Sequence, residues 1–190
     1  VVAVPLPLLR AGLPALRPGL PAGHAEALGR IGMGLLHKAA LRVEPWPAPD
    51  WADWVGQIPE TPGRWGAFAA LARATGEPVL VALHGGREAR RLEALPAVAV
   101  AAEAEGALAR MAGRAVRVRA IQVTGWGADP WSRGAYSHLP PGASPEDRRT
   151  LARPPSPRLA LAGEHCSADH PATLRGAWES GRAAALALIG

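Results

Sequence analysis

The sequence predicts a mixed α/β or α+β fold. Segments typical of strands and segments typical of helices alternate along its 190 residues, and no internal repeat is present. Hydrophobic residues make up 48% of the chain, as expected of a globular protein that buries a core. No apolar run approaches the roughly 20 residues that a membrane-spanning helix needs, so no membrane span is expected.

The first part of the chain is rich in proline and contains few predicted elements. Residues 1–4 are expected to form a short buried strand that ends at the prolines after it, and a chain that opens in this way is expected to be cut from a longer one. A short helix is expected over 22–30. Residues 35–43 are largely apolar and favour a strand. The tryptophan- and proline-rich segment 45–62 is expected to be a loop or short-helix region.

The rest of the chain alternates more regularly. Apolar and polar residues alternate over 116–123, as is typical of a half-buried strand. A proline early in the last segment is typical of the first turn of a helix. In order, the expected elements are a strand over 78–84, helices over 87–95 and 98–112, a strand over 116–123, a loop over 124–145, a short strand over 158–162 and a helix over 171–189.

Charge and cysteine content narrow the classes of function. The net charge of +5 comes from scattered arginines and not from one dense basic run, so no nucleic-acid partner is expected. The lone cysteine, Cys166, excludes an internal disulfide framework and a cysteine-based zinc site, and it fits a reducing, cytoplasmic compartment. His24, His84 and His138 each stand alone in the sequence, and no metal site is expected.

Two residue types that carry chemistry occur once each. Lys38 is the only lysine among 21 cationic residues, and Tyr136 is the only tyrosine. A lysine amine can exchange its proton when its surroundings tune it, whereas an arginine guanidinium cannot. Chance survival in an arginine-rich composition is the alternative, and composition alone does not decide between the two.

The end of the chain carries the strongest chemical signal. Leu159-Ala-Leu-Ala-Gly-Glu164 and the segment from His170 to Gly181 are typical of a strand, a glycine turn, an acidic residue and a helix start. Glu164 is placed to accept hydrogen bonds from a ligand hydroxyl. The helix start at 172–174 offers free N–H groups and a positive dipole end, which suit an anion or a ring that becomes anionic. An ordinary β-turn-α unit is the alternative interpretation.

These residues resemble the flavin-containing amine oxidases, a family of monoamine oxidases, polyamine oxidases and lysine-specific histone demethylases. Four segments match the family in the right order and span nearly the whole chain. They are Val2-Ala-Val-Pro5, Ile31-Gly-Met-Gly-Leu-Leu-His-Lys38, Trp126-Gly-Ala-Asp-Pro-Trp131 with Gly134-Ala-Tyr136, and Gly163-Glu164-His165 with Pro171-Ala-Thr-Leu-Arg-Gly-Ala.

The resemblance implies roles for single residues. Lys38 matches the family lysine that holds a water near flavin N5, and Tyr136 and Thr173 fall at substrate-binding positions. The implied cofactor is FAD, with the helix start stabilising negative charge on the reduced ring. The residues at cofactor-binding positions are Val4, Pro5, Trp126, Trp131, Gly163, Glu164, Ala172, Thr173 and Leu174.

Two positions depart from the monoamine oxidases. Ala135 stands where those enzymes carry the cysteine that bonds the flavin, so FAD is expected to bind non-covalently. Thr173 stands where they place a second tyrosine, so the two-tyrosine cage is incomplete. The resemblance therefore favours polyamine-oxidase-like or demethylase-like members, or a bacterial-type branch.

The glycine motif G-x-G-x-x-G, which binds the FAD pyrophosphate in this family, is not found in the sequence. The resemblance implies the FAD-linked amine oxidase fold without its N-terminal Rossmann-like unit. Residues 1–34 and 146–190 would form a discontinuous FAD domain, and residues 35–145 a substrate domain. The chain is expected to be a C-terminal fragment, inactive alone, that an N-terminal FAD-binding half of the same or a partner chain completes.

The implied reaction is oxidation of a small-molecule amine to an imine, hydrolysis to an aldehyde, and reoxidation of FAD by O2 to give H2O2. Two alternatives stay open: a non-catalytic or partner-completing module of the same fold, and a flavin oxidoreductase with a non-amine substrate. The presence of Lys38, Tyr136 and Glu164 counts against a decayed module. The Lys38 segment and the Asp-Pro-Trp segment favour an amine.

Overall fold

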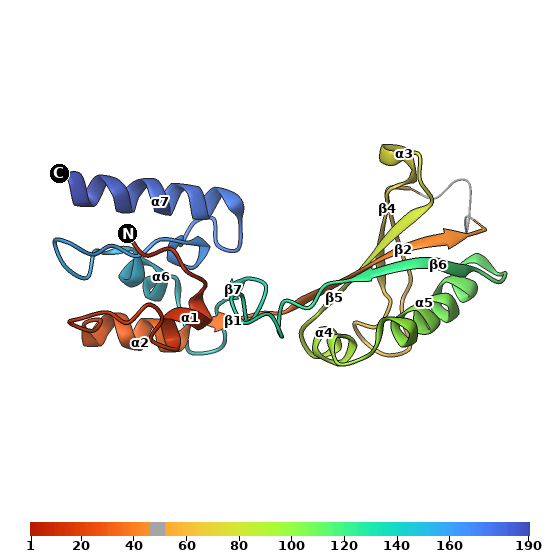
Figure 1. Cartoon of the computed structure of the whole chain (residues 1–190), viewed down its shortest axis with the longest axis horizontal. Helices are drawn as coiled ribbons and strands as arrows, with labels where there is room; N and C mark the ends of the chain where they lie inside the picture. The colour runs from red at the N-terminus through yellow and green to blue at the C-terminus, as the bar shows by residue number, and fades with distance from the viewer. Residues whose placement is uncertain (46–51) are drawn as a thin grey trace. The chain divides into compact units, whose positions relative to one another are not determined.

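The computed structural model describes residues 1–45 and 52–190, which divide into two compact units (Figure 1). The first, here the helical unit, combines Val1–Gly34 with Asp129–Gly190. The second, here the sheet unit, is Leu35–Ala128. Each unit has its own hydrophobic core.

Within its described residues, the sheet unit is built on a five-stranded antiparallel sheet. The strands follow the spatial order β3 (Trp54–Gly56), β4 (Ala67–Ala70), β5 (Val79–Gly85), β2 (Leu36–Glu44) and β6 (Arg117–Val123). The helices of this unit are α3 (Ala72–Thr75), α4 (Gly86–Glu93) and α5 (Ala97–Ala112). Figure 1 shows α4 and α5 lying together along the sheet.

Alternation along β2 decides which face of the sheet is buried. Alternate residues from His37 to Val43 are buried, whereas Lys38 lies between them on the opposite face and is exposed. The buried face packs against α4 through Leu92 and against α5 through Leu108. Each apolar side chain that is fully buried there contributes roughly 1.5–3 kcal/mol to the stability of the unit.

A buried histidine pair lies at one end of this core. His37 and His84 are cross-strand partners on β2 and β5, and their ring centroids are 5.8 Å apart. The Trp65 backbone N–H donates to His84 Nε2 at 3.3 Å, while both ring nitrogens of His37 lack a partner. Burial lowers the pKa of both imidazoles, and that of His84 falls to about 4 with His37 as the second cause. Both rings are therefore neutral at pH 7.

An ion-pair network fixes α4 against α5 beside this pair. The Arg91 guanidinium donates to both carboxylate oxygens of Glu103 at 2.7 and 2.6 Å and, through Nε, to Glu88 Oε1 at 2.9 Å. The Trp65 indole N–H also donates to Glu103, at 3.2 Å. These hydrogen bonds lower the pKa of both carboxyl groups and raise that of Arg91. A single exposed ion pair contributes little to stability. The pair of Arg91 with Glu103 does more, because the Glu103 carboxylate also accepts the N–H of the buried Trp65 indole.

The helical unit joins the two ends of the chain. Its elements are α1 (Leu6–Arg10), α2 (Ala22–Arg30), α6 (Pro145–Ala152), the 3₁₀ turn η1 (Glu164–Cys166) and α7 (Leu174–Ile189), with the short antiparallel pair β1 (Gly32–Met33) and β7 (Ser137–His138). α2 packs against α6, and α7 lies against η1. The core contains Leu6, Leu9, Ala27, Leu28, Ile31, Leu151, Leu161 and Cys166.

Polar contacts also join the N-terminal segment to the C-terminal one. The Val2 N–H donates to the Ala160 carbonyl at 2.8 Å, and the Ala162 N–H donates to the Val2 carbonyl at 2.9 Å. Arg30 Nε donates to Asp147 Oδ1 at 2.7 Å, which connects the end of α2 to the start of α6. The two segments therefore stabilise each other and form one unit.

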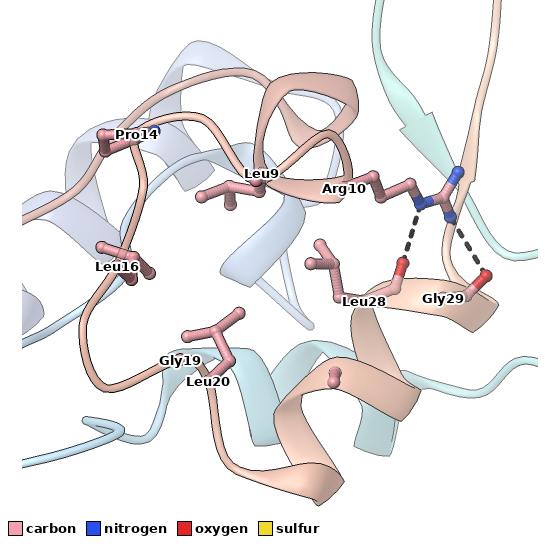
Figure 2. A pocket seen from close by; sticks show the side chains of 10 residues that line it. Leu9, Arg10, Pro14, Leu16, Gly19, Leu20, Leu28 and Gly29 are labelled. Atoms are coloured by element: carbon pink, nitrogen blue, oxygen red, sulfur yellow. Dashed lines mark hydrogen bonds between the residues drawn. The ribbon is translucent and has the colours of Figure 1, made fainter.

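An apolar pocket of about 390 Å³ lies between α1, the loop after it and α2. Figure 2 shows Leu9 and Leu20 along its wall and Arg10 at its edge. Arg10 donates to the carbonyls of Leu28 at 2.9 Å and Gly29 at 3.2 Å (Figure 2). A cation at this end complements the dipole of α2, so Arg10 fixes α1 to α2.

The structure confirms the mixed α/β character and most of the predicted elements. The strands expected over 35–43, 78–84 and 116–123 agree with β2, β5 and β6 to within 1 residue, and the helix over 22–30 agrees with α2. The expected strands over 1–4 and 158–162 are wrong. The two segments are joined by one parallel bridge, between Val2 and Leu161. A longer ladder does not form because the chain turns into α1 after the N-cap residue Pro5, and because the prolines just before residue 158 have no N–H to donate.

Three further differences have local causes. α6 was not expected, although Ser144 and Asp147 form a capping box ahead of it with Pro145 at its first turn. β3 falls in the segment expected to be a loop or short-helix region, of which residues 46–51, including Trp46 and Trp51, lie outside the described residues. The last helix begins at Leu174 and not at residue 171, because Thr173 caps it.

The two units also divide differently from the predicted domains. The chain passes from one unit to the other after Gly34 and returns after Ala128. Residues 129–145, expected in the central domain, lie in the helical unit. The physical reason is that β7 pairs with β1 and that Ser137 donates to Glu164.

The stability of the sheet unit is expected to fall as the pH drops from about 6.5 toward about 4. Because folding lowers the pKa of His84 to about 4, the unfolded chain takes up this proton first, and stability is lost across that window. His84→Gln should flatten the pH dependence of hydrogen exchange at the β5 amides. His138→Gln, at an exposed position in the helical unit, should leave it unchanged, and an equally steep dependence in His84→Gln would contradict the assignment.

Candidate functional site

The Glu164 carboxylate joins three segments of the helical unit. Its Oε1 accepts the Ser137 N–H at 2.9 Å, and its Oε2 accepts the Ser137 hydroxyl at 2.7 Å and the Ala172 N–H at 2.8 Å. The side chain is 21% exposed. An ionised carboxylate has about four acceptor positions, so these contacts leave roughly one, on Oε1, for a ligand donor.

The turn before Glu164 requires glycine. Gly163 has a φ of +140°, and a Cβ there would lie 2.4 Å from His165 Cε1. The Ser180 hydroxyl on α7 accepts the Gly163 N–H at 2.9 Å. The Gly-Glu turn is therefore tied directly to the helix that follows it.

The N-terminus of α7 is capped by the Thr173 side chain, but its first two N–H groups stay open to a ligand. Thr173 Oγ1 accepts the Gly176 N–H at 3.0 Å and donates to the His170 carbonyl at 2.8 Å. The first N–H groups of the helix, at Leu174 and Arg175, have no acceptor within it. With the positive end of the helix dipole, they suit an anion or a ring that gathers negative charge.

Arg148 lies behind this site, on α6. Its side chain is 2% exposed, and Nη1 donates to the Ser137 hydroxyl at 2.7 Å and to the His165 carbonyl at 3.3 Å. Nη1 is 3.8 Å from Glu164 Oε2. Burial lowers the pKa of Arg148 and the charge of Glu164 opposes that shift, so the group stays a cation.

The sheet unit holds two of the predicted residues, Lys38 and Trp126. Lys38 is exposed on the face of the sheet that the helices leave open, opposite Leu83 on β5. Its N–H donates to Thr124 Oγ1 at 2.8 Å, and its carbonyl accepts the Thr124 N–H at 3.0 Å. Trp126 follows the end of β6 and is 46% exposed.

The helical unit holds the other predicted residues. Trp131 is 71% exposed and Tyr136 is 41% exposed. Asp129 Oδ1 accepts the Trp131 N–H at 2.8 Å, and hydrogen bonds from backbone N–H groups lower the pKa of its carboxyl. Val4 is half-buried against the core, and Pro5 is the N-cap residue of α1.

The structure brings together five of the residues predicted to bind the cofactor, Gly163, Glu164, Ala172, Thr173 and Leu174. Ser137 and Arg148, which contact Glu164, were missed. The position of Ser137 directly after the Gly-x-Tyr segment is the sequence feature that could have indicated it. Arg148 had no such signal, because it belongs to α6, a helix that the sequence analysis did not predict. Burial raises the pKa of Cys166 to about 12, in keeping with a small buried residue.

The described parts of the chain contain neither a candidate membrane-spanning helix nor a candidate metal site. No helix in residues 1–45 or 52–190 combines the length and apolar character that a bilayer crossing requires. In the same residues, His, Cys, Asp and Glu side chains form no group of three or more able to hold a metal ion.

Comparison with known proteins gives consistent matches. The sequence model of the flavin containing amine oxidoreductases matches residues 1–189. Polyamine oxidase 4 of Oryza sativa subsp. japonica is 34% identical over 187 residues, which cover 97% of this chain and 38% of that protein. Lysine-specific histone demethylase 1 homolog 2 of Arabidopsis thaliana is 35% identical over 188 residues, or 94% of this chain and 25% of that protein. The chain thus spans well under half of each relative.

Substitution of two glycines on α7 is expected to have opposite effects. A Cβ at Gly176 would lie 2.0 Å from the His170 carbonyl oxygen, so Gly176→Ala should destabilise the docked helix by about 1–3 kcal/mol. A Cβ at Gly181 meets nothing within 4 Å, so Gly181→Ala should stabilise the helix by roughly 1 kcal/mol. Hydrogen exchange of the α7 amides measures both, and effects of the same sign would contradict the packing.

Proposed function

Because the chain belongs to the flavin-containing amine oxidoreductase family, we propose that its protein oxidises the C–N bond of an amine with FAD as electron acceptor. Water then hydrolyses the imine product to an aldehyde, and O2 takes up the electrons to give H2O2. The observation that carries the proposal is the 2.8 Å hydrogen bond from Ala172 to Glu164, which holds an acidic side chain beside the open start of α7.

The residues around Glu164 fit a non-covalently bound FAD. The open acceptor position on Glu164 suits a hydroxyl of the ribityl chain, and the N–H groups at the start of α7 suit the edge of the ring system that gathers negative charge on reduction. Ala135 offers no thiol for a covalent bond. When bound, FAD would supply the two-electron acceptor that no amino-acid side chain provides.

The outer face of α7 supports an additional FAD-binding half. Leu174, Trp178 and Ile189 lie along one side of this helix and are 91%, 69% and 80% exposed. Exposed apolar patches of this kind mark surfaces that other protein covers. We assign the patch to the N-terminal FAD-binding half, in the same or a partner chain, whose glycine motif this sequence lacks.

The aromatic residues support an amine substrate. An amine must be neutral to be oxidised, and apolar aromatic surroundings disfavour its cation. Tyr136 offers an exposed ring on a backbone that is held by hydrogen bonds from the Gly34 N–H to the Tyr136 carbonyl at 2.8 Å and from the Ala135 N–H to the Gly34 carbonyl at 2.9 Å. At the second substrate position, both roles of the Thr173 hydroxyl are used within the helix start, so its methyl group is free to line a cavity.

The proposal is tested by the anaerobic absorption spectrum of the longest natural form of this chain. A flavin band near ~450 nm that one class of amine bleaches is the expected result, because electron transfer into the flavin removes that band. A band that no amine bleaches would favour a flavin oxidoreductase with another substrate. The absence of a band in the longest form would leave the non-catalytic module.

Lys38→Met is expected to slow reoxidation of the reduced protein by O2 about 100-fold, since it removes a proton-exchanging cation. Lys38→Arg should restore little of the rate, because a guanidinium does not give up its proton. Stopped-flow mixing with oxygenated buffer measures this step separately from the anaerobic reduction.

The matched control for Lys38 is Arg42→Met, which removes an exposed cation on the same face of β2. Its reoxidation rate should stay close to that of the unmodified protein. If Lys38→Met also reoxidised at that rate, the assigned role of Lys38 would be wrong.

A further inference from the structure

Arg148 is a buried charge that the proposed reaction does not use. It is 1% exposed, and its Nε lies buried without a hydrogen-bond partner. Burying a guanidinium is costly unless other groups compensate its charge. The groups that do so here are the Ser137 hydroxyl, the backbone carbonyls of η1 and, at 3.8 Å, the Glu164 carboxylate.

The Ser137 hydroxyl links Arg148 to Glu164 in a defined direction. It accepts from Arg148 Nη1 at 2.7 Å and donates to Glu164 Oε2 at 2.7 Å. A hydroxyl carries one proton, so accepting from Arg148 turns that proton toward Glu164. Consecutive hydrogen bonds of this kind polarise one another inside a protein.

The same guanidinium also fixes the backbone that carries Glu164. Nη1 lies 3.3 Å from the His165 carbonyl and 3.5 Å from the Glu164 carbonyl. Both the main chain and the carboxylate of Glu164 are therefore held from α6. The final hydrogen bond of the series is the one from the Ala172 N–H to Glu164 Oε2.

We propose that Arg148 is a positioning residue of the flavin site. Through Ser137 it fixes the Glu164 carboxylate, and through that carboxylate it fixes the Ala172 amide and the start of α7. The proposal rests on the proposed function for the identity of the ligand, FAD. Its structural part, the coupling of Arg148 to Ala172, holds without any ligand.

The first measurement is hydrogen exchange at the Ala172 amide in the absence of FAD. Arg148→Met and Ser137→Ala should each speed this exchange about tenfold, as expected for the loss of one charge-assisted hydrogen bond. Arg148→Lys, which keeps the cation but not the planar fork, should give a smaller change. Arg149→Met is the matched control, because Arg149 is the next residue of α6, is 55% exposed and pairs with Glu146 on the surface.

The second measurement is the affinity for FAD of the longest natural form, followed by flavin fluorescence. Arg148→Met and Ser137→Ala should each weaken binding about tenfold, and the double variant should be little weaker than either, because both act through one carboxylate. If Arg148→Met does not fold, the comparison of Ser137→Ala with Arg149→Met carries the test.

Four results would overturn the inference. Unchanged exchange at Ala172 in the folded variants, or an equal change in Arg149→Met, would refute the coupling. Faster exchange with unchanged FAD affinity would refute the role in the flavin site while leaving the proposed function intact. An unmodified protein that binds no FAD would refute the proposed function first, before any substitution is compared, and with it the flavin part of this inference.

Discussion

Two N–H groups and one hydroxyl converge on the Glu164 carboxylate from β7 and from the loop before α7. Without that acceptor, the donors of Ser137 and Ala172 would lose their partner. The residues just before α7 would then lose the hydrogen bond that ties them to the Glu164 side chain. The turn η1, which begins with Glu164, packs against α6, α7 and β7. α6 supplies the cation behind it, and β1 holds β7 in place by pairing. The acid that we propose to face the ligand is thus also a structural cross-link.

Close approaches around this carboxylate explain the local sequence. Ala172 has a φ of +59°, a left-handed conformation that costs a non-glycine residue roughly 1–3 kcal/mol. The hydrogen bond to Glu164 helps to hold it there, with the Thr173 cap directly after it. Gly163 and Gly176 allow approaches that a Cβ would prevent. Whatever ligand the motif contacts, its glycines and the left-handed Ala172 also serve the packing of this turn against α7.

The sequence was sufficient for features that depend on local patterns. An apolar run predicted β2, alternation predicted β6, and the Gly-Glu turn with a helix start predicted the local backbone around Glu164. It was insufficient where long-range contacts decide. The capping box at Ser144 is visible only when that helix is sought, and nothing local shows that Arg148 reaches the Ser137 hydroxyl. The packing of residues 129–145 into the helical unit is likewise not visible locally, since the pairing of β7 with β1 spans about a hundred residues.

The position of Lys38 follows from a constraint of a different kind. Side chains alternate along β2, so the buried His37 forces Lys38 to the opposite face, and a slip of one residue would exchange the two. That register is fixed by the apolar residues that follow toward Val43, which pack against α4 and α5. The exposed amine and the buried neutral imidazole are therefore set by the same core. A core substitution that shifts the register would move the lysine without touching it, so the role proposed for Lys38 depends on the packing of this strand.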